Sequence, residues 1–221
     1  MKRQHLLAVL AAAALMGCRA DNGASIEITG RAFPTDVKGC TYSPGGDVAL
    51  ATPVYDPVLG GPFRVALYVR NNLVDPNKIA PGSTTQSNNW SAQSVKVRLN
   101  PSQFVDRYHP SPALLDLPQL ETVHPLLTSS VVEADGGEAT FIVDLLNDGL
   151  AAAILGSPDG SVVLGITLQG RVNGDGSRQD STEFPLPVLI QANSYIDPRP
   201  CPTGSVFTLS CDGQVFNGSC R

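Results

Sequence analysis

The sequence predicts an all-β protein built as an antiparallel β-sandwich, and three observations lead to this class. The chain of 221 residues contains 21 glycines and 18 prolines, a frequency typical of many short strands joined by turns. Apolar and polar residues alternate in several segments, as they do in strands with one face in a core. Stretches with helical periodicity are short, which argues against a helical domain.

Four segments show the alternation most clearly, and each is expected to form a half-buried antiparallel strand. In residues 63–70, for example, the odd-numbered positions are expected to face the core, whereas Arg64, Tyr68 and Arg70 face solvent. The four segments are 63–70, 94–99, 139–145 and 162–169, and shorter candidates are 25–30, 47–51 and 129–133.

Residues 184–190 are expected to form a strand at the edge of a sheet. Pro185 and Pro187 lie on the same side of its alternation, and neither can donate a hydrogen bond to a neighbouring strand. Prolines at an edge also discourage pairing with another chain.

Seven or eight strands at this spacing predict an immunoglobulin-like sandwich over residues 25–196, with a jelly roll as the alternative. One short helix is expected between two of the later strands, at 148–155. Asp148 is expected to cap this helix, and Gly156 to end it.

The first 17 residues predict a secretory signal peptide, because a basic start precedes an apolar run from Leu6 to Gly17. This run is shorter than the about 20 apolar residues that cross a hydrocarbon core. Its end, Leu15-Met16-Gly17-Cys18, resembles the lipobox of bacterial lipoproteins. The alternative is an ordinary secretory peptide cleaved near Ala20.

The lipobox resemblance implies that Cys18 becomes the N-terminus and is lipidated on its sulfur and its amine. More than one acyl chain gives stable anchoring in a membrane. Arg19 stands where an aspartate tends to retain lipoproteins in the inner membrane, so the resemblance implies the outer membrane. Residues 18–24 form a tether, and the six residues after Cys18 reach at most about 20 Å.

The net charge of the chain limits which classes of partner it can bind. Without Lys2 and Arg3, 13 basic residues face 20 acidic ones, a net charge of −7 with no run of either sign. Nucleic-acid binding requires a basic footprint, and a polybasic membrane contact requires a basic cluster. The sequence therefore predicts no nucleic-acid partner, and it leaves any small-molecule ligand unknown.

Four cysteines remain after Cys18, and an even number in an exported chain predicts two disulfides. In the tail, 197–221, Asp212-Gly213 favours a two-residue hairpin turn that places Cys220 near Ser205, about 20 Å from Cys211. A Cys211–Cys220 bond is therefore disfavoured. Two pairings stay open: Cys201–Cys220 with Cys40–Cys211, which is favoured, and Cys201–Cys211 with Cys40–Cys220.

Metal and cofactor signals are weak. The four cysteines lack the close CxxC spacing of structural zinc sites, so we expect no zinc site and no cofactor. The segment 173–180 has oxygen-bearing side chains but not the glycine and glutamate pattern of an EF-hand, and a glycine-rich hairpin turn is the preferred interpretation.

Residues 107–125 are expected to be a long, proline-rich connection whose leucines cover one end of the sandwich. A partner-binding lip and a mobile lid are the alternatives. This connection contains His109 and His124. Trp90 has polar neighbours that suit protein or carbohydrate contact, and the alternative is a residue of the sandwich that covers the end of a sheet. These three residues are the candidates for an interaction surface.

We expect a non-enzymatic structural or protein-interaction role at the cell envelope, because the chain has no GxSxG nucleophile motif. The alternative is an envelope hydrolase or metal-dependent enzyme that uses His109 and His124. With its lipobox and predicted sandwich, the chain resembles bacterial lipoproteins with an immunoglobulin-like body. This similarity of architecture transfers no site, because a fold alone does not specify a function.

Overall fold

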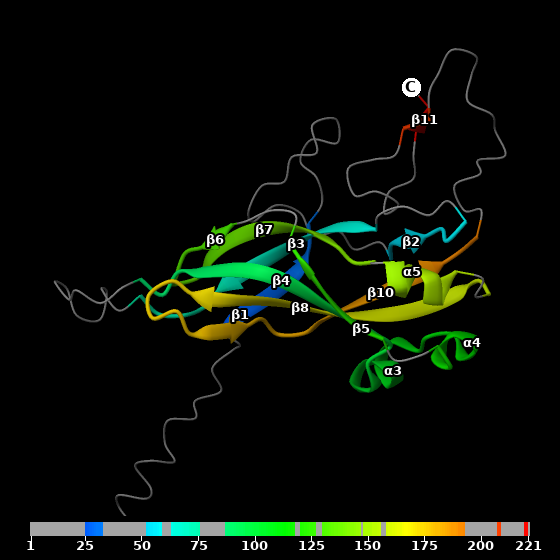
Figure 1. Ribbon diagram of the computed structural model, residues 1–221, viewed down its shortest axis with the longest axis horizontal. Helices are drawn as coiled ribbons and strands as arrows, with labels where there is room; N and C mark the ends of the chain where they lie inside the picture. Colours follow the sequence, from blue (N-terminus) through cyan, green and yellow to red (C-terminus); the bar gives the residue numbers. More distant parts are fainter. Residues whose placement is uncertain are drawn as a thin grey trace, which may run out of the picture.

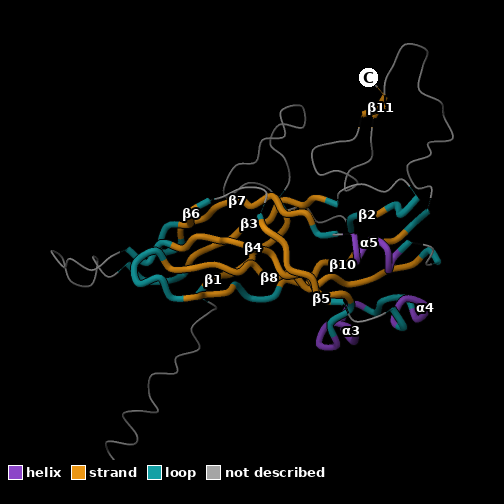
Figure 2. The backbone as a smooth tube through the Cα atoms, viewed as in Figure 1, coloured by secondary structure: helices purple, strands orange, loops and turns teal. Residues whose placement is uncertain are grey.

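Two β-sheets packed face to face form the body of the protein, and short helices lie at one end (Figures 1 and 2). The structure is a computed structural model, and the all-β prediction is confirmed in it. It describes residues 25–32, 52–58, 63–75, 87–117, 120–126, 130–146, 148–155, 158–192, 207–208 and 219–220.

The smaller sheet has three antiparallel strands in the order β1-β3-β7. β3 and β7 pair without a break in register, from Arg64 opposite Asp144 to Asn71 opposite Gly137. The strands are β1 (Ile26–Arg31), β3 (Arg64–Asn71) and β7 (Gly137–Asp144).

The larger sheet has the order β2-β10-β8-β4-β5, with β6 paired to β4 and β9 paired to β8. β2 runs parallel to β10, and the other pairs are antiparallel, so the sheet is mixed. Its strands are β2 (Val54–Tyr55), β4 (Trp90–Leu99), β5 (Glu121–Pro125), β6 (Val131–Val132), β8 (Gly160–Val172), β9 (Arg178–Asp180) and β10 (Phe184–Ile190).

The core lies between the two sheets, as the alternation predicts. Phe141 of β7 packs edge-to-face on Trp90 of β4, with ring centroids 6.1 Å apart. The predicted helix is present as α5 (Asp148–Ile154), and it buries Leu150 and Ile154. Gly156 lies outside the described residues, and so does the side chain of Asp148.

The central parts of two strands are buried on both faces, contrary to the prediction of one wet face, although the two arginines of β3 are exposed as predicted. In β3, Tyr68 is buried, because it joins Ala66, Ala32 and the partly buried Ile142 in a second small cluster. In β8, Val163 is also buried. Alternation shows which residues share a face, but it does not show whether another segment covers the outer one.

The edge prediction for β10 is wrong at one end. Its last two residues pair with β2, where the amides of Leu189 and Gln191 donate to the carbonyls of Pro53 and Tyr55 at 2.9 and 3.1 Å. β2 has only two residues, and its sequence gives no alternation from which a strand is recognised. Among the described strands, the proline-bearing part of β10 pairs with β8 alone.

The long connection after β4 contains regular structure instead of an irregular loop. It begins with two helices, α3 (Ser102–Tyr108) and α4 (Pro112–Leu115), and ends in strand β5. Leu114 is fully buried, so the expectation that this segment packs on the sandwich is confirmed. Figure 1 shows both helices on one side of the larger sheet, near one end of it.

Several smaller predictions have clear outcomes. β8 and β9 form a hairpin whose turn includes Gly176 at φ +70°, which confirms the hairpin interpretation of this segment. In the tail, β11 (Phe207–Thr208) pairs with β12 (Ser219–Cys220), and Cys220 lies opposite Phe207, two residues from the expected Ser205.

Other predictions fall outside the described residues. They concern the signal peptide, Cys18 with its tether, the strand at 47–51, Cys40, Cys201 and Cys211, and the side chain of Cys220. Within the described part of the chain, no helix has the length and hydropathy of a membrane span.

Candidate interaction surface

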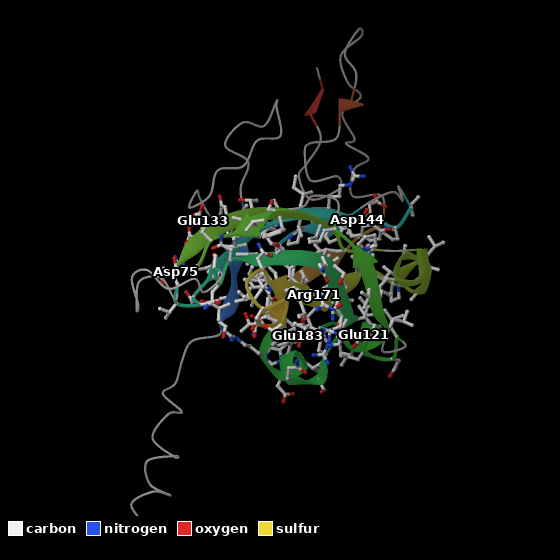
Figure 3. The ribbon with its side chains drawn as sticks, turned by 60° about the vertical axis from the view of Figure 1, so that its left-hand side comes forward. Asp75, Glu121, Glu133, Asp144, Arg171 and Glu183 are labelled. Carbon is white, nitrogen blue, oxygen red and sulfur yellow. The ribbon has the colours of Figure 1, made fainter. Side chains whose placement is uncertain are left out.

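The candidate surface lies on the outer face of the larger sheet and along its β5 edge. It has two parts, the helical insert (residues 101–117, which contain α3 and α4) and the β5 edge (Glu121–Pro125). Both follow β4 in the chain. Figure 3 shows Glu121 and Glu183 on the side of the sheet where α3 lies.

Asn100 fixes the start of the helical insert. Its φ of +44° lies in the left-handed region and turns the chain out of β4. Its backbone amide donates to the carbonyl of Val163 at 2.8 Å, and its side-chain oxygen accepts from the Val163 amide at 2.9 Å. Its side-chain nitrogen donates to the carbonyl of Leu114 at 2.9 Å. The buried side-chain amide of Asn100 therefore continues the β4–β8 ladder and also holds α4.

Ser111 makes a second attachment between the insert and β8. Its amide donates to the carbonyl of Ser161, and its Oγ accepts from the amide of Ser161, both at 2.9 Å. With Leu114 in the core, these bonds fix the insert firmly on the sheet. They support the expected cover of the sheet and argue against a mobile lid.

α3 carries a partly buried aromatic pair on this firmly attached segment. None of its residues is fully buried. Phe104 and Tyr108, one helical turn apart, meet edge-to-face with centroids 6.3 Å apart, and the guanidinium of Arg107 lies 5.4 Å from the Tyr108 ring centroid. Aromatic side chains and arginine are the residues most enriched at protein-binding hot spots.

An ion pair between Arg98 and Glu183 on the sheet contacts α3 and supports it. Arg98 of β4 donates from Nε to Glu183 at 2.8 Å and from Nη2 to its other carboxylate oxygen, and Gln103 of α3 donates to the same carboxylate. The hydrogen bond with Glu183 raises the pKa of Arg98 above its ordinary value. Gly165 makes room for these contacts, since a Cβ there would lie 2.2 Å from Glu183 and 2.7 Å from Pro101.

β5 is the last strand of the sheet, and alternate residues face different neighbours. The amide of Leu99 donates to the carbonyl of Leu120, so the even-numbered residues of β5 bond to β4. The amides and carbonyls of Glu121 and Val123 therefore point outward, and within the described residues no strand pairs with them. The Val123 side chain is 55% exposed.

The structure separates the three predicted interaction residues. His109 is exposed at the C-cap of α3 on the outer side, whereas His124 lies opposite Val95, on the face of β5 that turns toward the core. The structure therefore does not bring the two histidines together. No group of three His, Cys, Asp or Glu residues in the described ranges is placed to hold a metal.

The surface interpretation of Trp90 is wrong, and the alternative of a residue within the sandwich fits. Its ring is fully buried, and its Nε1 donates to the carbonyl of Gln179 at 2.7 Å. Gly170 explains how the ring fits, because a Cβ there would lie 2.6 Å from the indole. Polar sequence neighbours are a poor guide here, since Trp90 begins β4 and faces the core.

His124 is half-buried at the margin of the core. Burial lowers its pKa below the ordinary value, and the charge of Asp144 opposes this shift. The Thr122 hydroxyl lies 3.5 Å from His124 Nε2 on the same face of β5. The neutral imidazole is thus the form that this position favours.

Sequence reasoning missed two features of this surface. β5 has only one apolar residue, Val123, among Glu121, Thr122, His124 and Pro125, so its alternation carries almost no signal. The Arg98–Glu183 pair joins residues 85 positions apart, and no local pattern connects them. No protein-family model, curated protein or solved structure matches this chain.

Proposed function

We propose that the protein is a lipid-anchored protein of the cell envelope, held through Cys18 in the outer membrane, and that it binds a partner protein. The binding surface is the helical insert together with the β5 edge. The anchor rests on the lipobox resemblance of Leu15-Met16-Gly17-Cys18. The role is structural or adaptor-like, without catalysis.

We further propose an immunoglobulin-like body. The strand order supports it: β1, β3 and β7 correspond to strands A, B and E, whereas β10, β8, β4 and β5 correspond to G, F, C and C′. β3 and β8 contain no cysteine, so the disulfide that joins strands B and F in antibody domains is missing. Trp90, on the strand that corresponds to C, packs against Phe141.

One observation carries the proposed interaction: the β5 edge, which no described strand covers, lies beside a helix with a partly exposed aromatic pair on a firmly attached segment. Val123 offers apolar area, and Phe104 and Tyr108 offer rings that need little ordering on binding. Because Asn100 and Ser111 hold the insert on the sheet, a partner meets a preformed surface.

Site-specific photocrosslinking in intact cells tests the proposal. A photoreactive residue is placed at Val123 and, separately, at Tyr108 of the full-length protein. Val58 is the matched control, because it is also an exposed valine, at 63%, but lies beyond β2 at a different part of the surface. We expect one discrete protein adduct from Val123 and Tyr108, and none from Val58.

The anchor is tested in the same cells with Cys18→Ala. We expect this variant to leave the membrane fraction and to lose the adduct, because the partner is met at the membrane. Equal adducts at Val58 and Val123, or no adduct at either surface position, would contradict a binding role for this surface.

A further inference from the structure

We propose that the β5 edge binds an extended segment of the partner protein as an additional antiparallel strand, with a basic side chain opposite Glu121 and apolar side chains toward the core. This inference deepens the proposed function and rests on it. It specifies the conformation and the chemistry of the bound segment.

The backbone of β5 provides the hydrogen bonds. Glu121 and Val123 each point one amide and one carbonyl outward, and Pro125 points only a carbonyl, because proline has no N–H. An antiparallel segment of five residues can make five hydrogen bonds with these groups. Strand addition of this kind gives affinity through the main chain and specificity through alternate side chains.

The outer face of the edge selects charge and apolar area. The Glu121 side chain is 54% exposed, and its Oε2 lies 4.0 Å from Nζ of Lys96. Arg98, which lies opposite Glu121 in β4, is engaged by Glu183. A Lys or Arg of the added strand placed opposite Glu121 therefore gains a favourable cross-strand pair, and a β-branched residue opposite Val123 covers its side chain.

The inner face selects apolar residues. Thr122 and His124 turn toward the core, beside the partly buried Leu120 and Leu126. The two residues of the added strand that lie opposite Thr122 and His124 point to the same face of the larger sheet, the face that turns toward the core. Apolar side chains there extend the core, with about 25 cal/mol of stabilisation for each Å² of apolar surface removed from water.

A second copy of this chain is a poorer occupant than a foreign segment. If two β5 strands pair antiparallel around Val123, each Thr122 lies opposite a His124 of the other copy, so polar groups meet at the core margin. Glu121 then lies opposite Pro125, which offers no cation. The charge and the inner face both favour a partner with a different sequence.

The probe is the blocked peptide Thr-Val-Val-Ile-Lys with a fluorophore, which places Lys opposite Glu121 and Val and Ile on the inner face. Its binding to the full-length lipidated protein in detergent micelles is followed by fluorescence anisotropy. N-methylation of the third residue removes the amide that faces Val123, whereas N-methylation of the second removes an amide that points away. We expect at least a tenfold loss for the first change and less than a threefold loss for the second.

Variants of the protein locate the binding site. Val123→Pro removes an outward amide, and Val123→Thr keeps that amide and the shape of the side chain. We expect Val123→Pro to weaken peptide binding at least tenfold and Val123→Thr less than threefold. Glu121→Lys is expected to weaken the Lys peptide and to favour a peptide with Glu in place of Lys. Circular dichroism verifies that each variant is folded.

The proposal is overturned if the peptide does not bind at about 1 mM, or if methylation at the two positions has equal effects. It is also overturned if the protein self-associates through β5 and Val123→Pro makes it monomeric, because the occupant is then a second copy. Failure of the peptide together with a persistent crosslink from Tyr108 rejects strand addition and leaves the proposed interaction standing.

Discussion

The two edges of the larger sheet protect their backbone in different ways. On β10, Pro185 and Pro187 remove two outward donors, and β2 accepts the next two, from Leu189 and Gln191. On β5, the corresponding groups of Glu121 and Val123 have no strand partner in the described part of the chain. The β10 edge is protected by its prolines and by the short strand β2, whereas the β5 edge has no such protection among the described residues.

The largest expected effect comes from Asn100→Ala, which removes the attachment of the insert beside the β5 edge. The change leaves the Val163 amide and the Leu114 carbonyl without their buried partner. We expect a loss of about 2–4 kcal/mol in the free energy of unfolding. Urea denaturation measures it.

Asn100→Gly serves as the control, because glycine adopts the positive φ at no cost. It should be less destabilising than Asn100→Ala by about 1 kcal/mol. A change below about 0.5 kcal/mol for Asn100→Ala would mean that the insert is held by Leu114 and Ser111 alone.

The next effect tests the direction of the β5 amides. Thr122→Pro removes an amide that bonds to β4, and we expect a loss of about 2 kcal/mol or more. Val123→Pro removes an outward amide and should cost less than about 0.5 kcal/mol. Denaturation of the two variants side by side measures the difference, and equal losses would show that the assigned directions are wrong.

Replacing the prolines of β10 should give its edge outward backbone donors like those of the β5 edge. In Pro185→Val with Pro187→Val, two outward donors return, on a strand that already pairs with β8 on its other side. We expect concentration-dependent self-association by sedimentation velocity, with a change below about 1 kcal/mol in unfolding free energy. A variant that stays monomeric at every concentration would show that the prolines are not what protects this edge.

The smallest expected effect is the pH dependence of the β5 side. Burial lowers the pKa of folded His124 below its value of 6.5 in model compounds, so the unfolded chain takes up the proton first. This contribution to stability is complete above pH 6.5 and is lost as the pH falls through the lower, folded pKa. His124→Gln should therefore reduce the decline in unfolding free energy between about pH 7 and pH 5. An unchanged decline would assign the pH dependence to other groups.

The sequence predicts the strands whose apolar residues alternate, and it fails where burial comes from another segment. Phe141 and Val143 face the core as expected, because β7 shows strict alternation. Tyr68 is buried although its parity predicts exposure, since Ala66 and Ile142 pack around it. Such a second covered face depends on distant residues.

The candidate surface was only partly predictable. The leucines of the connection indicate packing, and Leu114 does pack in the core. The β5 edge depends instead on the pairing of β5 with β4. The sequence of residues Glu121–Pro125 does not indicate this pairing. Trp90 shows the opposite error, because its polar neighbours point to a surface while Gly170, 80 residues away, provides room for it inside.

The position of β1 has a mechanical consequence under the proposed N-terminal anchor. β1 lies antiparallel along β3 from its first residue, and the carbonyl of Ile26 also accepts from the Thr182 amide, next to β10, at 2.9 Å. A force applied along β1 at its N-terminal end loads the ladder bonds to β3 together and not one after another. Under the proposed anchor and the proposed partner at β5, tension between the membrane and the partner would be carried through both sheets, with β1 loaded in shear.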